Sequence, residues 1–478
     1  MERKNAWETY SKKDLKELEQ LSVEYREFLN QGKTERECVD NIVNTIEKAG
    51  YQELESLIKE GGALKPGDKV YSVWMNKSVV MFQIGDKPMA EGINILGAHI
   101  DSPRLDIKQN PLYEDGGFAY LDTHYYGGVK KYQWVTLPLA LHGVIVKKDG
   151  TTVEINVGED EEDPVFFISD LLIHLSQEQL EKKAAKVIEG EALDLIIGNR
   201  PIVIDKKTKK DEKKDEKKEK AVAKEVVKAG VLDILKQTYD IEEEDFISAE
   251  LEVVPAGKAR EAGFDRSMIL AYGQDDRVCA FTSLKAMLDT PKTDRTLCCI
   301  LVDKEEIGSV GATGMQSHFF DNAVAEVMNL NGEYSELNVR RCLAHSCMLS
   351  SDVSSAYDPS YASSFDKKNV AYLGGGMVFN KFTGARGKSG SNDANAEYLA
   401  HLRGVLDAKK IVYQTAELGK VDLGGGGTIA YILALYGMNV IDSGVAVLNM
   451  HAPWEATSKA DIYEAYRGYK AFAEGVSM

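Results

Sequence analysis

The stretch that decides the fold is LCCILVDKEEIGS, residues 297–309. Its first six residues are apolar, which is typical of a buried strand. Glu305 and Glu306 follow at the end of that strand, where two carboxylates are costly unless a cation or a proton compensates them. Gly308 then favours a sharp turn. We therefore predict that the two glutamates belong to a functional site at the end of a core strand.

A second segment of the chain has the same form. Residues 93–98 (INILGA) are mostly apolar and run into His99 and Asp101. Side chains alternate along a strand, so His99 and Asp101 share a face. That spacing allows the carboxylate to hold and polarise an imidazole that binds a metal. Together, the two segments indicate a metal-dependent hydrolase.

The composition is that of an ordinary soluble globular protein, with 44% hydrophobic and 28% charged residues. At 478 residues the chain is too long for one simple core, so we expect two domains. Its net charge of −18 argues against nucleic-acid binding, and no apolar run is long enough to predict a membrane span. The six cysteines lack zinc-finger spacing and the N-terminus lacks an apolar signal core, so we expect a cytoplasmic protein.

The local pattern changes along the chain. Residues 1–60 have helical spacing, residues 69–100 and 107–175 are typical of strands, and strands alternate with helices after residue 265. In that last part we expect a helix near 278–289 between two strands. The pattern predicts an α/β fold, a mixed sheet flanked by helices, that is interrupted by an inserted β-rich domain.

We place the domain boundaries where these patterns change. Residues 1–106 are the first part of the α/β domain, residues 107–262 are the insertion, and residues 263–478 are the second part. Within the insertion, residues 206–220 contain nine lysines and five acids. Such a run is either a basic interaction patch or a solvated helix or loop, and we favour the solvated segment.

Five segments offer metal-ligating side chains directly after apolar, strand-like sequence. Their candidate residues are His99, Asp275, Glu305 with Glu306, Asp352 and His451. Each alone has an ordinary structural explanation, such as a satisfied histidine or an aspartate that caps a helix or a turn. Their shared context carries the prediction. Two histidines and three carboxylates suffice for two cations bridged by one carboxylate.

The order of these motifs resembles the M18 family of metalloaminopeptidases, the aspartyl-aminopeptidase relatives, over about residues 90–470. The matching motifs are residues 97–105 (GAHIDSPRL), 275–277 (DDR), 303–309 (DKEEIGS), 351–352 (SD) and 449–451 (NMH). The resemblance implies an exopeptidase with two metal ions per subunit. It also implies a homo-oligomer, a dodecamer built from dimers, with the β-rich insertion as the dimerisation domain.

The resemblance also assigns ligands to each cation. One ion would be held by His99, Asp275 and Asp352. The other would be held by Asp275, Glu306 and His451, with Asp275 as the bridge. Zn²⁺ suits these ligands, and Co²⁺ or Mn²⁺ could occupy them.

Two further roles follow from the same resemblance. Glu305 would be the general base, and Asp101 would orient His99. A base must reach the water without being consumed as a ligand, and adjacent glutamates divide these roles because their side chains diverge.

Two weaker matches concern the substrate. His174 resembles a family histidine that enters a neighbouring subunit's active site, with a half-buried helical histidine as the alternative. Lys381 resembles the lysine that pairs with an acidic substrate side chain, with a solvated lysine as the alternative. The aspartyl members have tyrosine where this chain has Lys388. Lys381, Arg386 and Lys388 nonetheless predict that the site accepts acidic N-terminal residues.

The leading hypothesis is therefore a cytoplasmic zinc aminopeptidase that acts on peptides, acidic N-termini included. We expect no nucleic-acid partner and no membrane. A related dinuclear carboxypeptidase or amide deacylase is the alternative enzyme. The non-enzyme alternative is an assembly or cargo protein that keeps its metals for stability, but the intact Glu305 argues against it.

Overall fold

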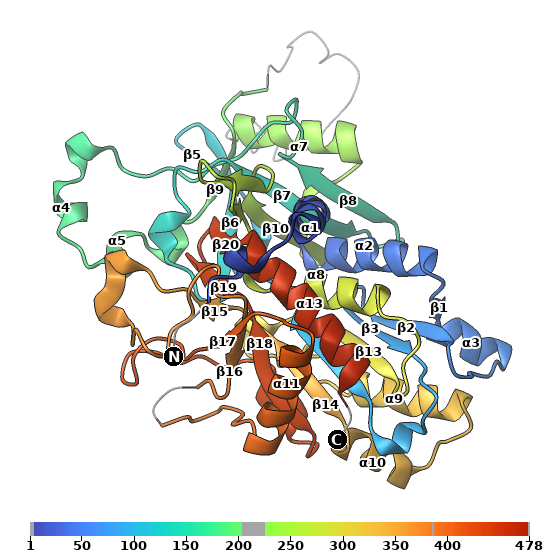
Figure 1. The fold of residues 1–478 in the computed structure, drawn as a ribbon. Coiled ribbons are helices and arrows are strands. Elements are labelled where there is room, and N and C mark those ends of the chain that lie inside the picture. The colour runs from blue at the N-terminus through green and yellow to red at the C-terminus, as the bar shows by residue number, and fades with distance from the viewer. Residues whose placement is uncertain (1–3, 203–224, 385–386, 477–478) are drawn as a thin grey trace. The chain divides into compact units, whose positions relative to one another are not determined.

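The structure, a computed structural model, describes residues 4–202, 225–384 and 387–476 (Figure 1). The charged segment 206–220 and Arg386 lie outside the described residues. The chain forms two compact units. The first unit comprises Met1–Ser102 and Lys258–Met478, and the second comprises Pro103–Gly257. The mixed α/β fold class predicted from the sequence is confirmed.

The centre of the first unit is a mixed sheet. Its described strands, from one edge to the other, are β1 (Gln52–Glu53), β2 (Lys69–Trp74), β3 (Ser78–Gln83), β13 (Leu297–Val302), β4 (Asn94–His99), β14 (Cys347–Ser351), β18 (Asn439–Gly444), β16 (Met377–Asn380) and β17 (Tyr413–Thr415). The four central strands, β13, β4, β14 and β18, are mutually parallel. Their carboxyl ends therefore meet at one edge of the sheet.

Helices cover both faces of this sheet because its central strands are apolar on both sides. In β13, Leu297, Cys299 and Leu301 pack in one hydrophobic cluster. Ile300, which lies on the opposite face, packs in another. The first cluster includes residues of α1 (Lys12–Gln31), α2 (Glu35–Lys48), α8 (Gln274–Leu288), α11 (Ala396–Ala408) and α13 (Lys459–Gly475). The second includes residues of α3 (Leu54–Glu60), α9 (Phe319–Leu330), α10 (Glu336–Ala344) and α12 (Ala430–Ala434).

The helices and strands of this unit largely follow the sequence pattern. The helices expected in residues 1–60 are α1, α2 and α3. Capping boxes at Ser11 and Thr34 fix the first turns of α1 and α2. The strand expected at 297–302 has the bounds of β13. The helix expected near 278–289 begins earlier, as α8, although the backbone angles of Asp275 and Asp276 are not helical.

A smaller sheet in the first unit carries two of the loops that matter below. Its described strands, in order, are β11 (Arg260–Ala262), β12 (Met268–Ala271), β20 (Glu455–Ser458), β19 (Ala446–Leu448) and β15 (Ser354–Ser355). The described short helical turns of this unit are η1 (Ala6–Thr9), η2 (Met89–Glu91), η8 (Glu305–Ile307) and η9 (Pro359–Ser364).

The second unit is built on an antiparallel sheet. Its described strands, in order, are β8 (Thr152–Val157), β7 (Leu139–Val146), β10 (Ala249–Pro255), β5 (Arg104–Asp115), β6 (Phe118–Tyr126) and β9 (Leu195–Gly198). The described helices and helical turns are η3 (Lys131–Gln133), η4 (Ile173–Leu175), α4 (Gln177–Leu180), α5 (Ala184–Val187), η5 (Gly190–Ala192), α7 (Val226–Tyr239) and η7 (Glu243–Ser248). Trp134, which is fully buried, is the largest side chain of its core.

Candidate metal centre

Three of the predicted segments end at the carboxyl edge of the central sheet. His99 is the last residue of β4, and Asp352 follows β14 directly. Glu305 and Glu306 lie in η8, which two residues separate from β13. Parallel strands with these ends in common bring side chains from distant parts of the chain to one place.

The other two predicted ligands come from loops of the smaller sheet. Asp275 lies in the first turn of α8, which follows β12. His451 lies between β19 and β20. The φ angle of His451 is 65°, in the left-handed region that is uncommon for a residue with a side chain.

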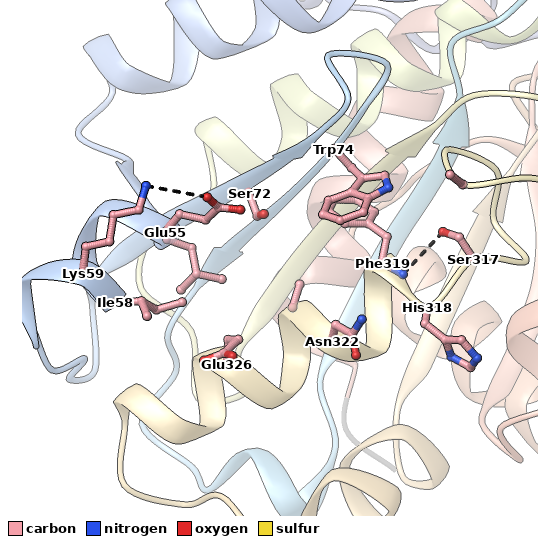
Figure 2. Close-up of a pocket in the computed structure, with 13 residues that line it drawn as sticks. Glu55, Ile58, Lys59, Ser72, Trp74, Ser317, His318, Phe319, Asn322 and Glu326 are labelled. Atoms are coloured by element: carbon pink, nitrogen blue, oxygen red, sulfur yellow. Dashed lines mark hydrogen bonds and ion pairs between the residues drawn. The ribbon is translucent and has the colours of Figure 1, made fainter.

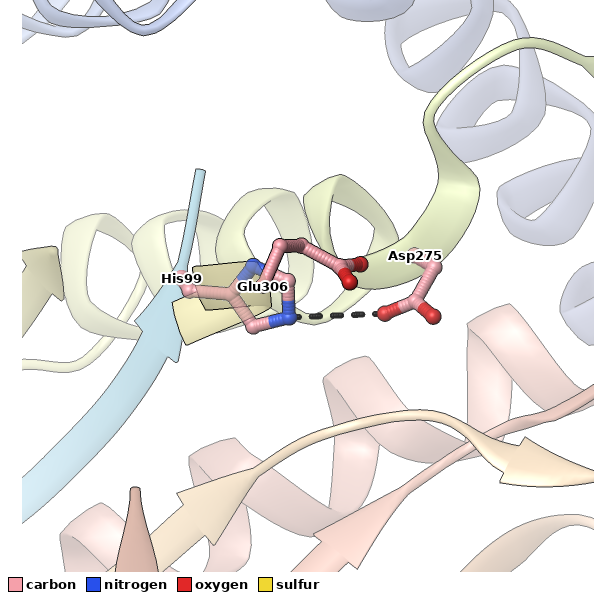
Figure 3. Close-up of side chains that lie close together, drawn as sticks. All are labelled: His99, Asp275 and Glu306. Carbon is pink, nitrogen blue, oxygen red and sulfur yellow. Dashed lines mark ion pairs between the residues drawn. The ribbon is translucent and has the colours of Figure 1, made fainter. Parts of the chain in front are cut away.

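The carboxylate of Asp275 lies between the two histidines. Its Oδ1 atom is 3.4 Å from His99 Nε2, and its Oδ2 atom is 3.3 Å from His451 Nε2. His451 Nε2 is also 3.5 Å from Glu306 Oε2. Figure 3 shows His99, Asp275 and Glu306 pointing toward one another. This is the arrangement expected of a bridging carboxylate with an imidazole on either side.

The side chains form two overlapping groups of potential ligands. In one group, ligand atoms of His99, Asp275 and Glu306 all lie within 4.8 Å of one another. In the other, the same holds for His99, Asp276 and Asp352. Sequence reasoning did not propose Asp276 as a ligand, although its place beside Asp275 was a signal. The predicted ligands therefore lie close together, but the two groups are not the predicted sets: His99 belongs to both, and Asp352 groups with Asp276 and not with Asp275.

These residues fit a metal by their chemistry. Imidazole nitrogen and carboxylate oxygen are the atoms that hydrolytic zinc sites use. Glu306 Oε1 and Asp276 Oδ1 are buried and have no hydrogen-bond partner in the described part of the chain. Buried carboxylate oxygens without partners are unfavourable unless a cation or a proton satisfies them.

Asp101 holds both the histidine and the glutamates. His99 Nδ1 lies 3.1 Å from Asp101 Oδ1, and the backbone N–H groups of Glu305 and Glu306 donate to its two oxygens at 3.1 Å each. When Nδ1 donates to this carboxylate, Nε2 is the nitrogen of His99 that can offer its lone pair to a cation. The contact predicted between Asp101 and His99 is thus present.

The electrostatics of the cluster favour positive charge. Burial, together with nearby carboxylates, raises the pKa of Glu305 to about 7. Burial and the charge of Asp275 raise the pKa of Glu306 well above its usual value. The pKa of Asp352 is shifted in the same direction, by burial and then by Asp276. A bound cation would relieve these unfavourable charges.

Asp275 and His99 behave differently because they pair with each other. Burial would raise the pKa of Asp275, but hydrogen bonds with His451 and His99 lower it below its usual value. Burial would lower the pKa of His99, but its contacts with Asp101 and Asp275 raise it well above the usual value. Among the carboxylates of the cluster, Asp275 is thus well suited to stay ionised.

The substrate residues predicted from sequence lie in different surroundings. His174 is exposed in η4 of the second unit, so the alternative of a half-buried helical histidine is wrong. We call the described residues 381–384 and 387–394 the lysine loop. In it, Lys381 Nζ contacts Asp393 Oδ1, and Lys388 Nζ lies 3.0 Å from Asp393 Oδ2. The sequence offered no signal that Asp393 would bind both lysines.

A groove elsewhere on the first unit is lined by other residues. It has a volume of about 430 Å³ and lies between α3, β2 and α9. Figure 2 shows Trp74 and Phe319 next to each other among the lining residues, and their rings stack with centroids 6.0 Å apart. Among the described residues, its lining includes none of the predicted site residues. In the part of the chain that the structure describes, this groove is therefore separate from the cluster of predicted ligands.

The helices of the described part include none that is both long and apolar enough to cross a membrane.

Comparison with known proteins gives a consistent result. The model of a family described as aminopeptidase I zinc metalloprotease (M18) matches residues 28–473. A probable M18 family aminopeptidase 1 of Clostridium acetobutylicum is 60% identical over 471 residues, 98% of each chain. Another, of Thermotoga maritima, is 44% identical over 475 residues, 99% of each chain.

Solved structures agree. The crystal structure of an M18 aminopeptidase from Thermotoga maritima has a TM-score of 0.91 at 44% identity and covers 100% of both chains. That of aminopeptidase I from Clostridium acetobutylicum has a TM-score of 0.89 at 58% identity, covering 99% of this chain and 100% of the other. The S. cerevisiae mApe1 dodecamer, with a TM-score of 0.72 at 18% identity over 94% and 95% of the chains, shares the fold.

Proposed function

The chain belongs to the M18 family of zinc aminopeptidases, and from this premise we propose that it removes N-terminal residues from peptides with two cations per subunit. The observation that carries the proposal is the carboxylate of Asp275, which lies between His99 and His451. In this proposal His99, Asp275 and Asp352 hold one cation. Asp275, Glu306 and His451 hold the other.

The bound cations would supply Lewis-acid activation of a water molecule. Glu305 is suited to accept its proton, because burial raises the pKa of Glu305 to about 7 and leaves it able to take up and return a proton near neutral pH. Its Oε2 atom lies 3.9 Å from His99 Nε2, at the edge of the ligand cluster. Glu305 would then pass the proton to the leaving amine.

Asp101 would keep this arrangement in place. It binds His99 Nδ1 and the backbone of both glutamates, so it fixes one ligand and the base relative to each other. Zn²⁺ is the cation that the family description names, and Co²⁺ or Mn²⁺ would suit the same ligands.

We further propose that acidic N-terminal residues are accepted through Lys381 and Lys388. Both ammonium groups contact Asp393, so an acidic substrate side chain must compete with a carboxylate that is already there. The preference for acidic residues should therefore be weak. The binding free energy that an acidic side chain gains would be only the difference between two similar ion pairs, one with the substrate and one with Asp393.

We also propose that the chain forms a homo-oligomer, a dodecamer built from dimers. The segment around His174 exposes several large apolar side chains in the second unit, and Ile173 and Leu175 are 67% and 68% exposed. Contiguous exposed apolar surface is typical of a subunit interface. At such an interface His174 would reach the active site of a neighbouring subunit.

A cytoplasmic location fits the thiols. All six cysteines lie in the described part of the chain, and all are buried and free. Free thiols are the usual state in a reducing compartment.

The direct test uses free and N-acetylated peptides that begin with Asp, Glu or Leu. Metal-dependent release of the first residue from the free peptides alone supports an aminopeptidase. Equal cleavage of the acetylated peptides would instead favour the alternatives left open by the residues, a dinuclear carboxypeptidase or an amide deacylase. A folded, metal-loaded protein that cleaves nothing would favour an assembly protein.

A further inference from the structure

We propose that Glu455 is a positioning residue of the metal centre, whose carboxylate holds the backbone of Asp275 and His451 together. Glu455 opens β20 and is 1% exposed. The inference rests on the proposed function, because it concerns two of the proposed ligands.

Each oxygen of Glu455 accepts one hydrogen bond from a different loop. The backbone N–H of Asp275 donates to Oε2 at 3.0 Å, and the backbone N–H of His451 donates to Oε1 at 2.8 Å. The side chains of these two residues are themselves 3.3 Å apart. One carboxylate therefore fixes the distance between the loops that carry a bridging ligand and a terminal ligand.

The backbone conformation of His451 has to be stabilised by contacts with its surroundings. Its φ angle of 65° is a conformation that a residue with a side chain rarely adopts, so the surroundings must maintain it. The hydrogen bond from the N–H of His451 to Glu455 acts at that residue.

Glu455 is itself held in place through its backbone carbonyl group. Gln274 Nε2 donates to the carbonyl oxygen of Glu455 at 2.6 Å, and the Tyr25 hydroxyl donates to Gln274 Oε1 at 3.2 Å. All three residues are buried. A positioning residue that is itself held in this way can transmit geometry to the ligands.

The two N–H groups bind different oxygens of the Glu455 carboxylate, and this arrangement gives the test. A carboxylate offers two acceptor oxygens, whereas the amide of glutamine offers one and places an NH₂ group where the other was. Glu455→Gln should therefore release one of the two loops. Loss of such outer contacts usually weakens metal binding about 10–100-fold.

A matched control is available in the same unit. Asp461 is also fully buried, and its two oxygens accept the backbone N–H groups of Gly374 and Gly376 at 2.9 and 2.7 Å. It holds no proposed ligand. Asp461→Asn thus makes the same chemical change away from the metal centre.

The experiment measures zinc bound per chain in chelator-buffered solution, together with the visible spectrum of the Co²⁺-loaded protein. We expect Glu455→Gln to bind one of two Zn²⁺ ions about 10–100-fold more weakly and to change the Co²⁺ spectrum. Asp461→Asn should leave both unchanged. If Glu455→Gln does not fold, Glu455→Asp, which keeps two oxygens on a shorter side chain, should show the same loss of affinity.

Unchanged zinc affinity in folded Glu455→Gln, or an equal loss in Asp461→Asn, would overturn the inference. A wild-type protein that binds two zinc ions in the same experiment keeps the proposed function intact in that case. A wild-type protein that binds no zinc would overturn the proposed function, and this inference with it.

Discussion

The metal centre and the lysine loop are both built from charged side chains, but those charges are held differently. In the metal centre, buried carboxylates such as Asp101 and Glu455 bind backbone N–H groups and fix the positions of their neighbours. In the lysine loop, Lys381, Lys388 and Asp393 are partly exposed, and the ammonium groups of both lysines contact the carboxylate of Asp393. We infer from this difference that the buried charges fix the chemistry, whereas the exposed charges adjust selectivity.

The largest effect should come from the residue at the middle of the centre. Asp275→Asn replaces the carboxylate that faces both histidines, so zinc affinity should fall by more than about 100-fold and activity should be lost. Zinc analysis and peptide hydrolysis measure both. Asp276→Asn is the control, because Asp276 belongs only to the second ligand group. Equal losses in the two variants would contradict the bridging role of Asp275.

The second-largest effect should distinguish the proposed general base, Glu305, from the proposed metal ligand, Glu306. Glu305→Gln should lower kcat about 10²–10⁴-fold and leave two zinc ions bound, because the amide cannot accept the proton. Glu306→Gln should lose zinc instead. Activity assays and zinc analysis on both variants check this, and full turnover by Glu305→Gln would remove Glu305 as the base.

The pH dependence should differ between the two regions. Burial raises the pKa of Glu305 to about 7, so below that pH the base is protonated and activity should fall as the pH decreases. Bound cations would lower the pKa of Glu305, so the fall in activity would then occur at lower pH. Hydrogen bonds to both lysines lower the pKa of Asp393, which stays ionised, so the ratio of acidic to neutral substrate cleavage should stay constant between about pH 6 and 8. If the ratio of acidic to neutral substrate cleavage instead changed with pH in parallel with the overall rate, the two regions would not act separately.

The smallest effect concerns the lysine loop itself. Asp393→Asn frees Lys381 and Lys388 for the substrate, so kcat/KM for N-terminal Glu relative to Leu should rise roughly 2–5-fold, as expected for exposed ion pairs. Asp366→Asn is the control, since Asp366 makes local hydrogen bonds in another loop. An unchanged ratio would show that the lysines do not meet the substrate side chain.

The sequence predicted the parts of the centre that depend on strands. The bounds of β13 follow from an apolar run. His99 ends β4 and Glu306 lies shortly after β13, and the parallel pairing of these two strands brings their ends together. It did not predict Glu455 or Asp393. Their roles depend on which loop backbone or which ammonium group lies nearby, and contacts between residues distant in the chain leave no periodic pattern.

A zinc titration of metal-free protein tests the two-cation aminopeptidase centre most directly. Bound zinc per chain and the cleavage of free-amine peptides are measured at each step. We expect two zinc ions per chain at saturation, with release of the N-terminal residue that depends on them and no cleavage of N-acetylated peptides. Full activity with no bound zinc, or saturation without cleavage of any free peptide, would contradict such a centre.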